Sequence, residues 1–438
     1  MQLLKEFTKY VSLNVLGMIG LSCYILADTF FVANGIGING LTALNLSISI
    51  YSVIHGTGLL IGIGSASQFA INKGSNENTI KNNQIFSNAI MLSILISLVF
   101  IFIGVFLTPA LASLLGANID TLEMTSTYLK TILCFSPFFI LNNVGIAFVR
   151  NDNNPTLAMI AMLIGSLSNI ILDYYFIFDL DMGIFGAALA TGLAPIISLC
   201  ILSLHLFKKQ NTFHLIKSKL HVETIKHIIQ FGNASFIMEI SSSVILIIFN
   251  LLLLNLGGNI AVAAYGIIAN IALVATSVFT GIGQGIQPLV SQYYASQKKK
   301  ELFTTLRYAL FSSLTIATII YGIIFFNSQI LISAFNNENN QTLYSIASTG
   351  LQMYFVGFFF AGINISMTSF FSATALTKQA FVTSICRTGG LLIPFAFILS
   401  SIFGIQGLWL SFVCSELGTL LFVIYLTKRN RDFLSLTI

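Results

Sequence analysis

Charged side chains are scarce in this sequence. Asp, Glu, Lys and Arg make up 8% of the 438 residues, whereas hydrophobic residues make up 56% and the mean hydropathy is +0.89. A soluble domain of this size carries roughly a quarter charged residues, so the composition excludes a soluble protein. Apolar runs such as 89–109 are long enough to cross a bilayer as a helix. We therefore predict an all-α integral membrane protein.

Two further absences narrow the possible functions. The five cysteines lie in apolar segments without paired spacing, which indicates neither a disulfide framework nor a metal site, so they are interpreted as small packing residues. The sequence also has no phosphate-binding loop and no Gly-rich nucleotide fingerprint. ATP hydrolysis within the chain is therefore not expected. We predict a protein that is not an enzyme, has no cofactor and draws its energy from an ion gradient.

Polar breaks divide the apolar residues into about twelve spanning segments, six in each half of the chain. The expected cores are 11–33, 42–71, 84–108, 121–149, 156–178, 183–207, 228–255, 261–293, 305–327, 342–371, 379–400 and 405–427.

Basic residues fall at alternate connections between these segments and at the two ends of the chain. They include Lys5, Lys9, Lys73, Lys81, Arg150, Lys208, Lys209, Lys298, Arg307, Lys378, Lys428 and Arg431. The other connections carry acids, among them Asp120, Asp179, Asp181 and Glu338. This asymmetry predicts that both termini are cytoplasmic in a multi-pass protein of the inner (cytoplasmic) membrane. It also accounts for the net charge of +5, so we expect no nucleic-acid partner.

The chain is an internal repeat. Ala43 falls on Ala264, Gly62 on Gly283 and Gly64 on Gly285, all 221 residues apart. We expect an N-terminal six-helix lobe at 1–207, a cytoplasmic linker at 208–226 and a C-terminal six-helix lobe at 227–438. An even number of helices per copy makes the repeat parallel, an arrangement typical of secondary transporters.

Four acids lie within predicted spanning segments: Asp28, Asp173, Glu239 and Glu416. An ionisable group at that depth costs about 2.5–3.5 kcal/mol on insertion scales and indicates function by default. None of the four falls on another acid under the shift of 221 residues. Symmetry of the scaffold therefore does not explain them.

Asp28 and Asp173 belong to the same half and have polar neighbours. Asn169 precedes Asp173 by one helical turn, and Thr191 supplies a hydroxyl from the next segment. The two carboxylates could share a proton, because they repel one another in a medium of low dielectric constant. They could instead hold a cation such as Na⁺ with the Asn and Thr oxygens. Binding of either ion removes charge and permits a different helix packing. The alternative is that Asp28 and Asp173 have a purely structural role.

The remaining polar groups leave more than one interpretation open. Glu239 could be satisfied by the hydroxyls of 241–243, could attract a cationic substrate, or could carry a second proton. Glu416 is interpreted as answering a local polar need, with a transport role as the alternative. His55 is interpreted as a satisfied polar residue, with proton carriage as the alternative. Arg387 has no obvious partner in the sequence.

Four motifs in order resemble the multidrug and toxic compound extrusion (MATE) family, most closely its DinF-like branch. They are Ala-Asp-Thr-Phe-Phe-Val at 27–32, Asn-Ile-Ile-Leu-Asp at 169–173, Gly-Ile-Phe-Gly-Ala-Ala-Leu-Ala-Thr at 183–191, and Gly-Gln-Gly-Ile-Gln-Pro at 283–288. The resemblance covers essentially the whole chain. It implies a V-shaped pair of six-helix lobes that exports amphiphilic, often cationic drugs or toxic compounds in exchange for Na⁺ or H⁺.

The resemblance also implies a cation site in the N-terminal lobe, formed by Asp28, Asn169, Asp173 and Thr191 with the backbone carbonyl of Ala187. Glu239 is similar to the seventh-helix acid of the NorM-like branch. The tenth-helix acid that accompanies it there is not apparent in 366–374, so no cation site is expected in the C-terminal lobe. The expected partners are small amphiphilic or cationic substrates and membrane lipid, and we expect a monomer.

The sequence disfavours two other functions. A flippase for lipid-linked saccharides would tend to have additional helices or a basic cavity, and the sequence indicates neither. A non-transporting membrane receptor or scaffold would have no use for unmatched carboxylates at membrane depth.

Overall fold

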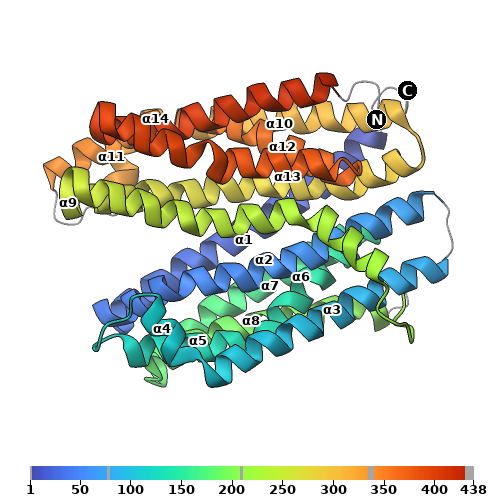
Figure 1. Cartoon of the computed structure of the whole chain (residues 1–438), viewed down its shortest axis with the longest axis horizontal. Helices are drawn as coiled ribbons and strands as arrows, with labels where there is room; N and C mark the ends of the chain where they lie inside the picture. Colours follow the sequence, from blue (N-terminus) through green and yellow to red (C-terminus); the bar gives the residue numbers. More distant parts are fainter. Residues whose placement is uncertain (1, 76–78, 208–210, 334–339, 430–438) are drawn as a thin grey trace. The chain divides into compact units, whose positions relative to one another are not determined.

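The computed structural model describes residues 2–75, 79–207, 211–333 and 340–429. These residues form helices joined by short connections and contain no strand (Figure 1), which confirms the predicted all-α fold class. A helix satisfies every backbone polar group within the spanning segment, as hydrocarbon surroundings require. Lys208, Lys209, Glu338 and Arg431, which the topology prediction used, lie outside the described residues.

The first half of the chain forms eight α-helices and one π-helical turn. Their bounds are α1 (Gln2–Gly35), α2 (Ile38–Gly74), α3 (Thr79–Phe106), α4 (Thr108–Leu114), α5 (Leu122–Cys134), α6 (Ser136–Asn151), α7 (Pro155–Tyr174), the π-helical turn η1 (Tyr175–Asp179) and α8 (Gly183–Phe207). A short break separates α5 from α6, and the two helix axes differ in direction by 47°. Helix α7 continues directly into η1.

The second half follows the same plan with fewer interruptions. Its elements are α9 (Val222–Ala295), α10 (Lys299–Ser333), α11 (Gln341–Tyr354), η2 (Phe355–Gly357), α12 (Phe358–Ala373), α13 (Thr377–Ile385), the π-helical turn η3 (Cys386–Gly390) and α14 (Leu392–Arg429).

Two glycines divide the longest helices. Gly258 in α9 has φ 65° and Gly404 in α14 has φ 60°, a left-handed conformation that glycine adopts without steric cost. Nine helical stretches of the described chain are long and apolar enough to span a membrane, and the bent pair α5–α6 adds a tenth. Because the stretches that contain Gly258 and Gly404 each hold two spans, the described residues contain twelve. This confirms the predicted twelve helices.

The described residues divide into two compact units. Unit 2 comprises Ser12–Ile240, and unit 1 comprises Met1–Val11 with Ser241–Ile438. The start of α1 thus belongs with the second half of the sequence, whereas the start of α9 belongs with the first half. The lobe boundaries expected from the repeat describe where the sequence duplicates, and they stay a prediction.

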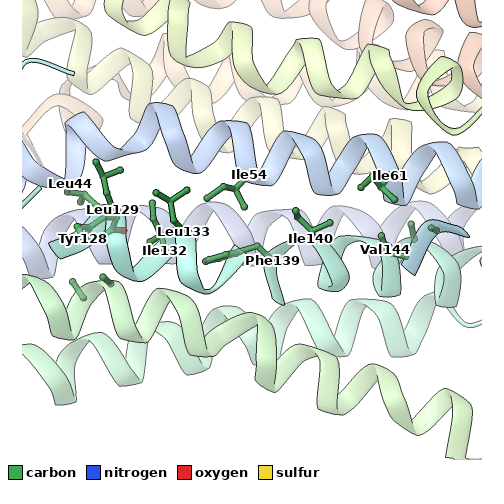
Figure 2. Packing of buried hydrophobic residues seen from close by; sticks show 14 of the residues in the cluster. Leu44, Ile54, Ile61, Tyr128, Leu129, Ile132, Leu133, Phe139, Ile140 and Val144 are labelled. Carbon is green, nitrogen blue, oxygen red and sulfur yellow. The ribbon is translucent and has the colours of Figure 1, made fainter. Parts of the chain in front are cut away.

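The largest hydrophobic core of unit 2 lies between α2 and the bent pair α5–α6. Figure 2 shows side chains of α2, among them Leu44, Ile54 and Ile61, facing those of α5 and α6, such as Leu129 and Ile140. All five are at most 4% exposed. Dense packing of this kind holds α2 against α5 and α6.

Glycines allow the start of α9 to pack directly on α2 within unit 2. A Cβ atom on Gly64 would overlap the carbonyl group of Ile228, and one on Gly232 would overlap that of Leu60. Small residues let membrane helices approach to backbone contact. This close approach fixes residues 222–240 in unit 2.

Candidate functional site

The five residues expected to form a cation site all lie within unit 2. Asp28 is on α1, Asn169 and Asp173 are one turn apart on α7, and Ala187 and Thr191 are one turn apart on α8. Each is buried, with Asp28 the most exposed at 7%. Three helices that are separated in the sequence therefore contribute polar groups to the interior of one unit.

Hydrogen bonds organise the α7 and α8 side of this group. In the orientation of the Asn169 amide that satisfies both ends, its nitrogen donates to Asp173 Oδ2 at 3.1 Å and its oxygen accepts from the Thr191 backbone N–H at 3.2 Å. The Thr191 hydroxyl donates to the Ala187 carbonyl at 3.0 Å. These bonds fix the side chains of α7 relative to the backbone of α8.

The two carboxylates are left incompletely satisfied. Oδ1 of Asp28 and Oδ1 of Asp173 are buried and accept no hydrogen bond from any described residue. The two groups also interact electrostatically with one another. A buried charge without a partner costs several kcal/mol, and like charges add to that cost. A proton or a metal cation at these oxygens would remove both penalties.

A layer of tyrosines adjoins the carboxylates, and the sequence reasoning missed it. Tyr24 precedes Asp28 by one turn of α1, and its hydroxyl lies 2.7 Å from that of Tyr51 on α2. Tyr128 on α5 interacts with the side chain of Thr191 and with both Asp28 and Asp173. The four-residue spacing of Tyr24 and Asp28 was a usable signal, because residues so spaced share a helix face. No local signal pointed to Tyr128.

His55 and Glu239 form a pair that the sequence did not suggest. Nδ1 of His55 on α2 lies 3.2 Å from Oε1 of Glu239 on α9, and both belong to unit 2. The Tyr51 ring stacks on the His55 ring with an interplanar angle of 5°. The Glu239 side chain is 30% exposed, far more than Asp28 or Asp173. It can therefore meet a molecule from outside the protein.

Glu416 belongs to unit 1. Its Oε1 accepts from Arg387 Nε at 2.7 Å, and its Oε2 accepts from Asn364 Nδ2 at 2.8 Å. Both charged side chains are buried. The structure thus supplies the local partners that Glu416 needs, and it gives Arg387 the partner that the sequence did not reveal.

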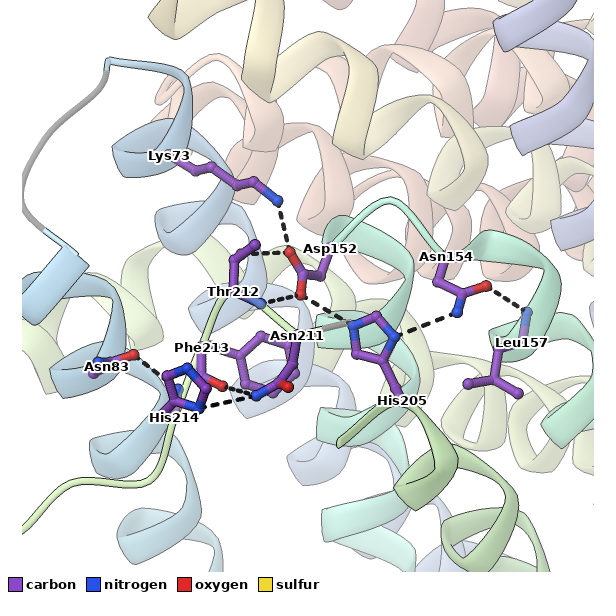
Figure 3. Close-up of polar contacts among 10 residues, drawn as sticks. All are labelled: Lys73, Asn83, Asp152, Asn154, Leu157, His205, Asn211, Thr212, Phe213 and His214. Carbon is purple, nitrogen blue, oxygen red and sulfur yellow. Dashed lines mark hydrogen bonds and ion pairs between the residues drawn. The ribbon is translucent and has the colours of Figure 1, made fainter. Parts of the chain in front are cut away.

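A further polar cluster lies where α6 ends, around Asp152 (Figure 3). Lys73 Nζ lies 2.6 Å from Oδ1 of Asp152, His205 Nε2 lies 3.0 Å from Oδ2, and the Thr212 backbone N–H donates to Oδ2 at 2.6 Å. Burial alone would raise the pKa of Asp152, but the bonds from His205, Lys73 and Thr212 outweigh it and lower the pKa to about 2. The carboxylate is therefore ionised and satisfied, unlike those of Asp28 and Asp173.

The described part of the linker is bound to α3 as well as to Asp152. Backbone N–H groups of His214, Ile216 and His221 donate to side chains of α3, namely Asn83 Oδ1, Ser87 Oγ and Asn88 Oδ1, at 2.8 to 2.9 Å. The Phe213 ring packs among the rings of Phe69, Phe86 and Phe148. The linker residues from 211 to 221 are consequently part of unit 2.

No group of three or more His, Cys, Asp or Glu side chains suited to a metal ion occurs within residues 2–75, 79–207, 211–333 and 340–429. Any cation at Asp28 and Asp173 would therefore also depend on amide, hydroxyl or carbonyl oxygens. Oxygen donors suit hard cations, so the donor set fits an ion such as Na⁺ as well as it fits a proton.

Twelve apolar spans in two repeated units, with unsatisfied acids buried in one of them, define a multi-pass membrane transporter. Comparison with known proteins identifies the transporter family. The MatE family model matches residues 15–175 and again 234–398. The chain therefore belongs to the multidrug and toxic compound extrusion family, whose members are ion-coupled transporters and not enzymes. The double match agrees with the internal repeat.

Individual relatives support the same assignment. The chain is 28% identical over 395 residues to the multidrug export protein MepA of Staphylococcus saprophyticus, covering 89% of this chain and 86% of that protein. It is 25% identical over 393 residues to MepA of Staphylococcus aureus, with the same coverage. The family match does not favour a flippase, a receptor or a scaffold.

Solved structures show the same fold. A crystal structure of a MATE protein in complex with MaL6 has a TM-score of 0.93 at 21% identity, covering 98% of this chain and 97% of the other. An outward-facing multidrug resistance MATE family transporter has a TM-score of 0.91 at 22% identity, with coverages of 98% and 96%. The fold is thus shared along nearly the whole chain.

Proposed function

We propose that this chain is a cation-coupled antiporter that exports amphiphilic, often cationic drugs or toxic compounds in exchange for Na⁺ or H⁺. Its staphylococcal relatives are multidrug export proteins, which supports the substrate class. Asp28 and Asp173, with Asn169, Thr191 and the Ala187 carbonyl, are proposed as the coupling site. These are the residues that the resemblance to the DinF-like branch implies.

One observation carries the proposal: each of the two carboxylates has a buried oxygen that accepts no hydrogen bond from the described residues. Buried acids with a purely structural role are normally satisfied by neighbouring donors. Asp152 in the same unit illustrates that condition, since three residues donate to it. The contrast supports a pair of carboxylates that awaits a cation.

Coupling then follows from charge. Entry of a proton or Na⁺ neutralises part of the repulsion between Asp28 on α1 and Asp173 on α7. The packing of α1 that is favoured with the ion bound differs from the packing favoured without it, so the ion shifts an equilibrium between two conformations. A substrate that prefers the ion-free conformation is released when the ion binds.

Glu239 and His55 are proposed to contact the substrate or to carry a second proton. Their side chains are 30% and 15% exposed, and the Tyr51 ring adjoins the pair. A carboxylate next to an aromatic face suits an organic cation, because both attract positive charge. Glu416 is not proposed for this role, since Arg387 and Asn364 already occupy its oxygens.

The proposed setting is the cytoplasmic membrane with both termini cytoplasmic and the chain acting as a monomer. The cluster around Asp152, Lys73 and the linker would then lie at the cytoplasmic ends of α2, α6 and α8. Positive charge at these connections supports that orientation.

The test is efflux of a fluorescent organic cation from proteoliposomes, driven separately by a Na⁺ gradient and by a pH gradient. Asp28→Asn should abolish exchange under whichever gradient drives the wild type, while the purified variant stays monodisperse. Asp179→Asn, at an exposed acid in η1, is the matched control and should keep wild-type exchange. Undiminished exchange by Asp28→Asn would refute the coupling site.

A further inference from the structure

Unit 1 contains a buried ion pair that the proposed transport mechanism does not use. Arg387 lies on η3 and Glu416 on α14, and their side chains are only 8% and 1% exposed. Nε of Arg387 lies 2.7 Å from Oε1 of Glu416. Asn364 on α12 donates its side-chain N–H to the other carboxylate oxygen and to the Glu416 backbone carbonyl, both at 2.8 Å. Each oxygen of this acid therefore has a donor.

The internal repeat relates this pair to the coupling site proposed in unit 2. Under the shift of 221 residues, the four side chains of that site fall on Phe249, Gly390, Pro394 and Phe412. Unit 1 thus has none of the side-chain oxygens of that site at the matching positions. Arg387 lies three residues before Gly390, and Glu416 lies four residues after Phe412. The charged pair consequently sits about one helical turn from the repeat-related positions, on the same two helices of the unit.

The buried carboxylates of the two units also differ in how their negative charge is compensated. A carboxylate buried among membrane helices needs a compensating positive charge, because hydrocarbon does not solvate it. In unit 2 the described residues leave Asp28 Oδ1 and Asp173 Oδ1 without a donor. In unit 1 the positive charge is a guanidinium, which is covalently attached to the chain. It cannot leave when the outside concentration of Na⁺ or H⁺ changes.

We propose that Arg387 is a tethered counter-ion that occupies, in unit 1, the place that the exchangeable cation takes in unit 2. Unit 1 therefore binds no coupling ion, and ion dependence arises from unit 2 alone. The comparison with an exchangeable cation in unit 2, and the statement that ion dependence arises from unit 2 alone, rest on the proposed function. The consequence that Glu416 becomes a cation site once Arg387 is removed does not.

Ion binding to purified protein tests the proposal in a background that silences unit 2, Asp28→Asn with Asp173→Asn. This background should bind neither radioactive Na⁺ nor an additional proton between pH 8 and pH 6. Adding Arg387→Ala should create one new site for Na⁺ or H⁺ per protein, and adding Glu416→Gln as well should remove it. Arg307→Ala, at an exposed arginine of α10, is the matched control and should create no site.

A second measurement separates ion binding from loss of fold. N-ethylguanidinium should bind to the Arg387→Ala protein and raise its melting temperature, because it returns a guanidinium to the vacated position, whereas Arg387→Ala with Glu416→Gln should not respond. A folded Arg387→Ala protein that binds no additional ion and ignores N-ethylguanidinium overturns the proposal. Cation binding that survives in the unit 2 background and is lost on adding Glu416→Gln would reveal a native ion site in unit 1 and overturn the proposal. Surviving binding that Glu416→Gln leaves unchanged would refute the coupling site instead, and the difference made by Arg387→Ala would still be readable.

Discussion

His205 Nε2 lies 3.0 Å from Oδ2 of Asp152, joining the end of α8 to the turn between α6 and α7. Lys73 from the end of α2 and Thr212 from the linker bind the same carboxylate. One acid thus ties together three helix ends and the connection to the second half of the chain. Its role is to hold unit 2 together where the chain leaves it.

Replacing this acid should destabilise unit 2. Asp152→Asn keeps the size of the side chain but removes the charge that Lys73 and His205 face, and breaking a buried charged network costs about 3–5 kcal/mol. The melting temperature of the purified protein should fall, whereas Asp120→Asn, at an exposed acid, should leave it unchanged. Equal melting temperatures for Asp152→Asn and wild type would contradict the role given to this cluster.

The stabilisation should depend on pH in one direction. Because the pKa of Asp152 is lowered to about 2 in the folded protein, from an ordinary value near 4, its ionised form favours folding. This contribution, about 2 kcal/mol after allowance for solvent screening, is complete above about pH 4 and is lost as the pH falls toward 2. The difference in melting temperature between wild type and Asp152→Asn should shrink over that range, and a difference that widens would be inconsistent with the assignment.

Tyr128 should tune the affinity of the coupling site. Tyr128→Phe removes a hydroxyl that interacts with Thr191 and with both carboxylates, while the ring stays in the core. A hydrogen bond between neutral groups contributes about 0.5–1.5 kcal/mol, so losing the bond to Thr191 should change the cation concentration for half-maximal efflux by roughly two- to ten-fold. Tyr425→Phe, at an exposed ring, serves as the control. An unchanged cation dependence would remove Tyr128 from the site.

Glu239 should discriminate substrates by charge. Glu239→Gln removes a partly exposed negative charge beside His55 and the Tyr51 ring. We expect KM to rise for organic cations and to stay unchanged for uncharged amphiphiles, measured in the same proteoliposomes. If both substrate classes lose transport equally, Glu239 acts in coupling, as a second proton carrier would.

The contact between α2 and α9 should tolerate no side chain. Gly64→Ala would press a methyl group against the backbone at Ile228, and overpacking of this kind typically costs about 1–3 kcal/mol. Gly266→Ala is a suitable control, because a Cβ atom there would meet no atom within 4 Å. A lower melting temperature for Gly64→Ala alone is the expected result.

Much of this fold is predictable from sequence because hydrocarbon leaves a spanning segment few alternatives. Runs of apolar residues forecast the twelve spans, and the shift that places Gly64 on Gly285 revealed the duplication. The acids Asp28 and Asp173 stood out for an equally simple reason, the cost of burying charge. That they share the interior of one unit was expected from their common half.

Partnerships between distant helices were beyond the sequence. Arg387 and Glu416 are 29 residues apart, and His55 and Glu239 are 184 apart, so neither helical spacing nor a motif could pair them. Tyr128 reaches the carboxylates only because α5 packs beside α8. The sequence also gave no sign that Asp152 organises the linker, since its partners come from three separate segments.

The exchange of end segments between the two units affects how the chain can be cut. Glu6 accepts a bond from Tyr293 at 3.0 Å, so the first residues belong to unit 1, whereas Gly232 is packed on Leu60 in unit 2. A protease that cleaves once within the linker would therefore produce two fragments. The first fragment would keep the helical segment 2–11, which packs in unit 1, and the second would keep the start of α9, which packs in unit 2. Such fragments should co-purify in mild detergent, and neither half expressed alone would contain all of its own interior.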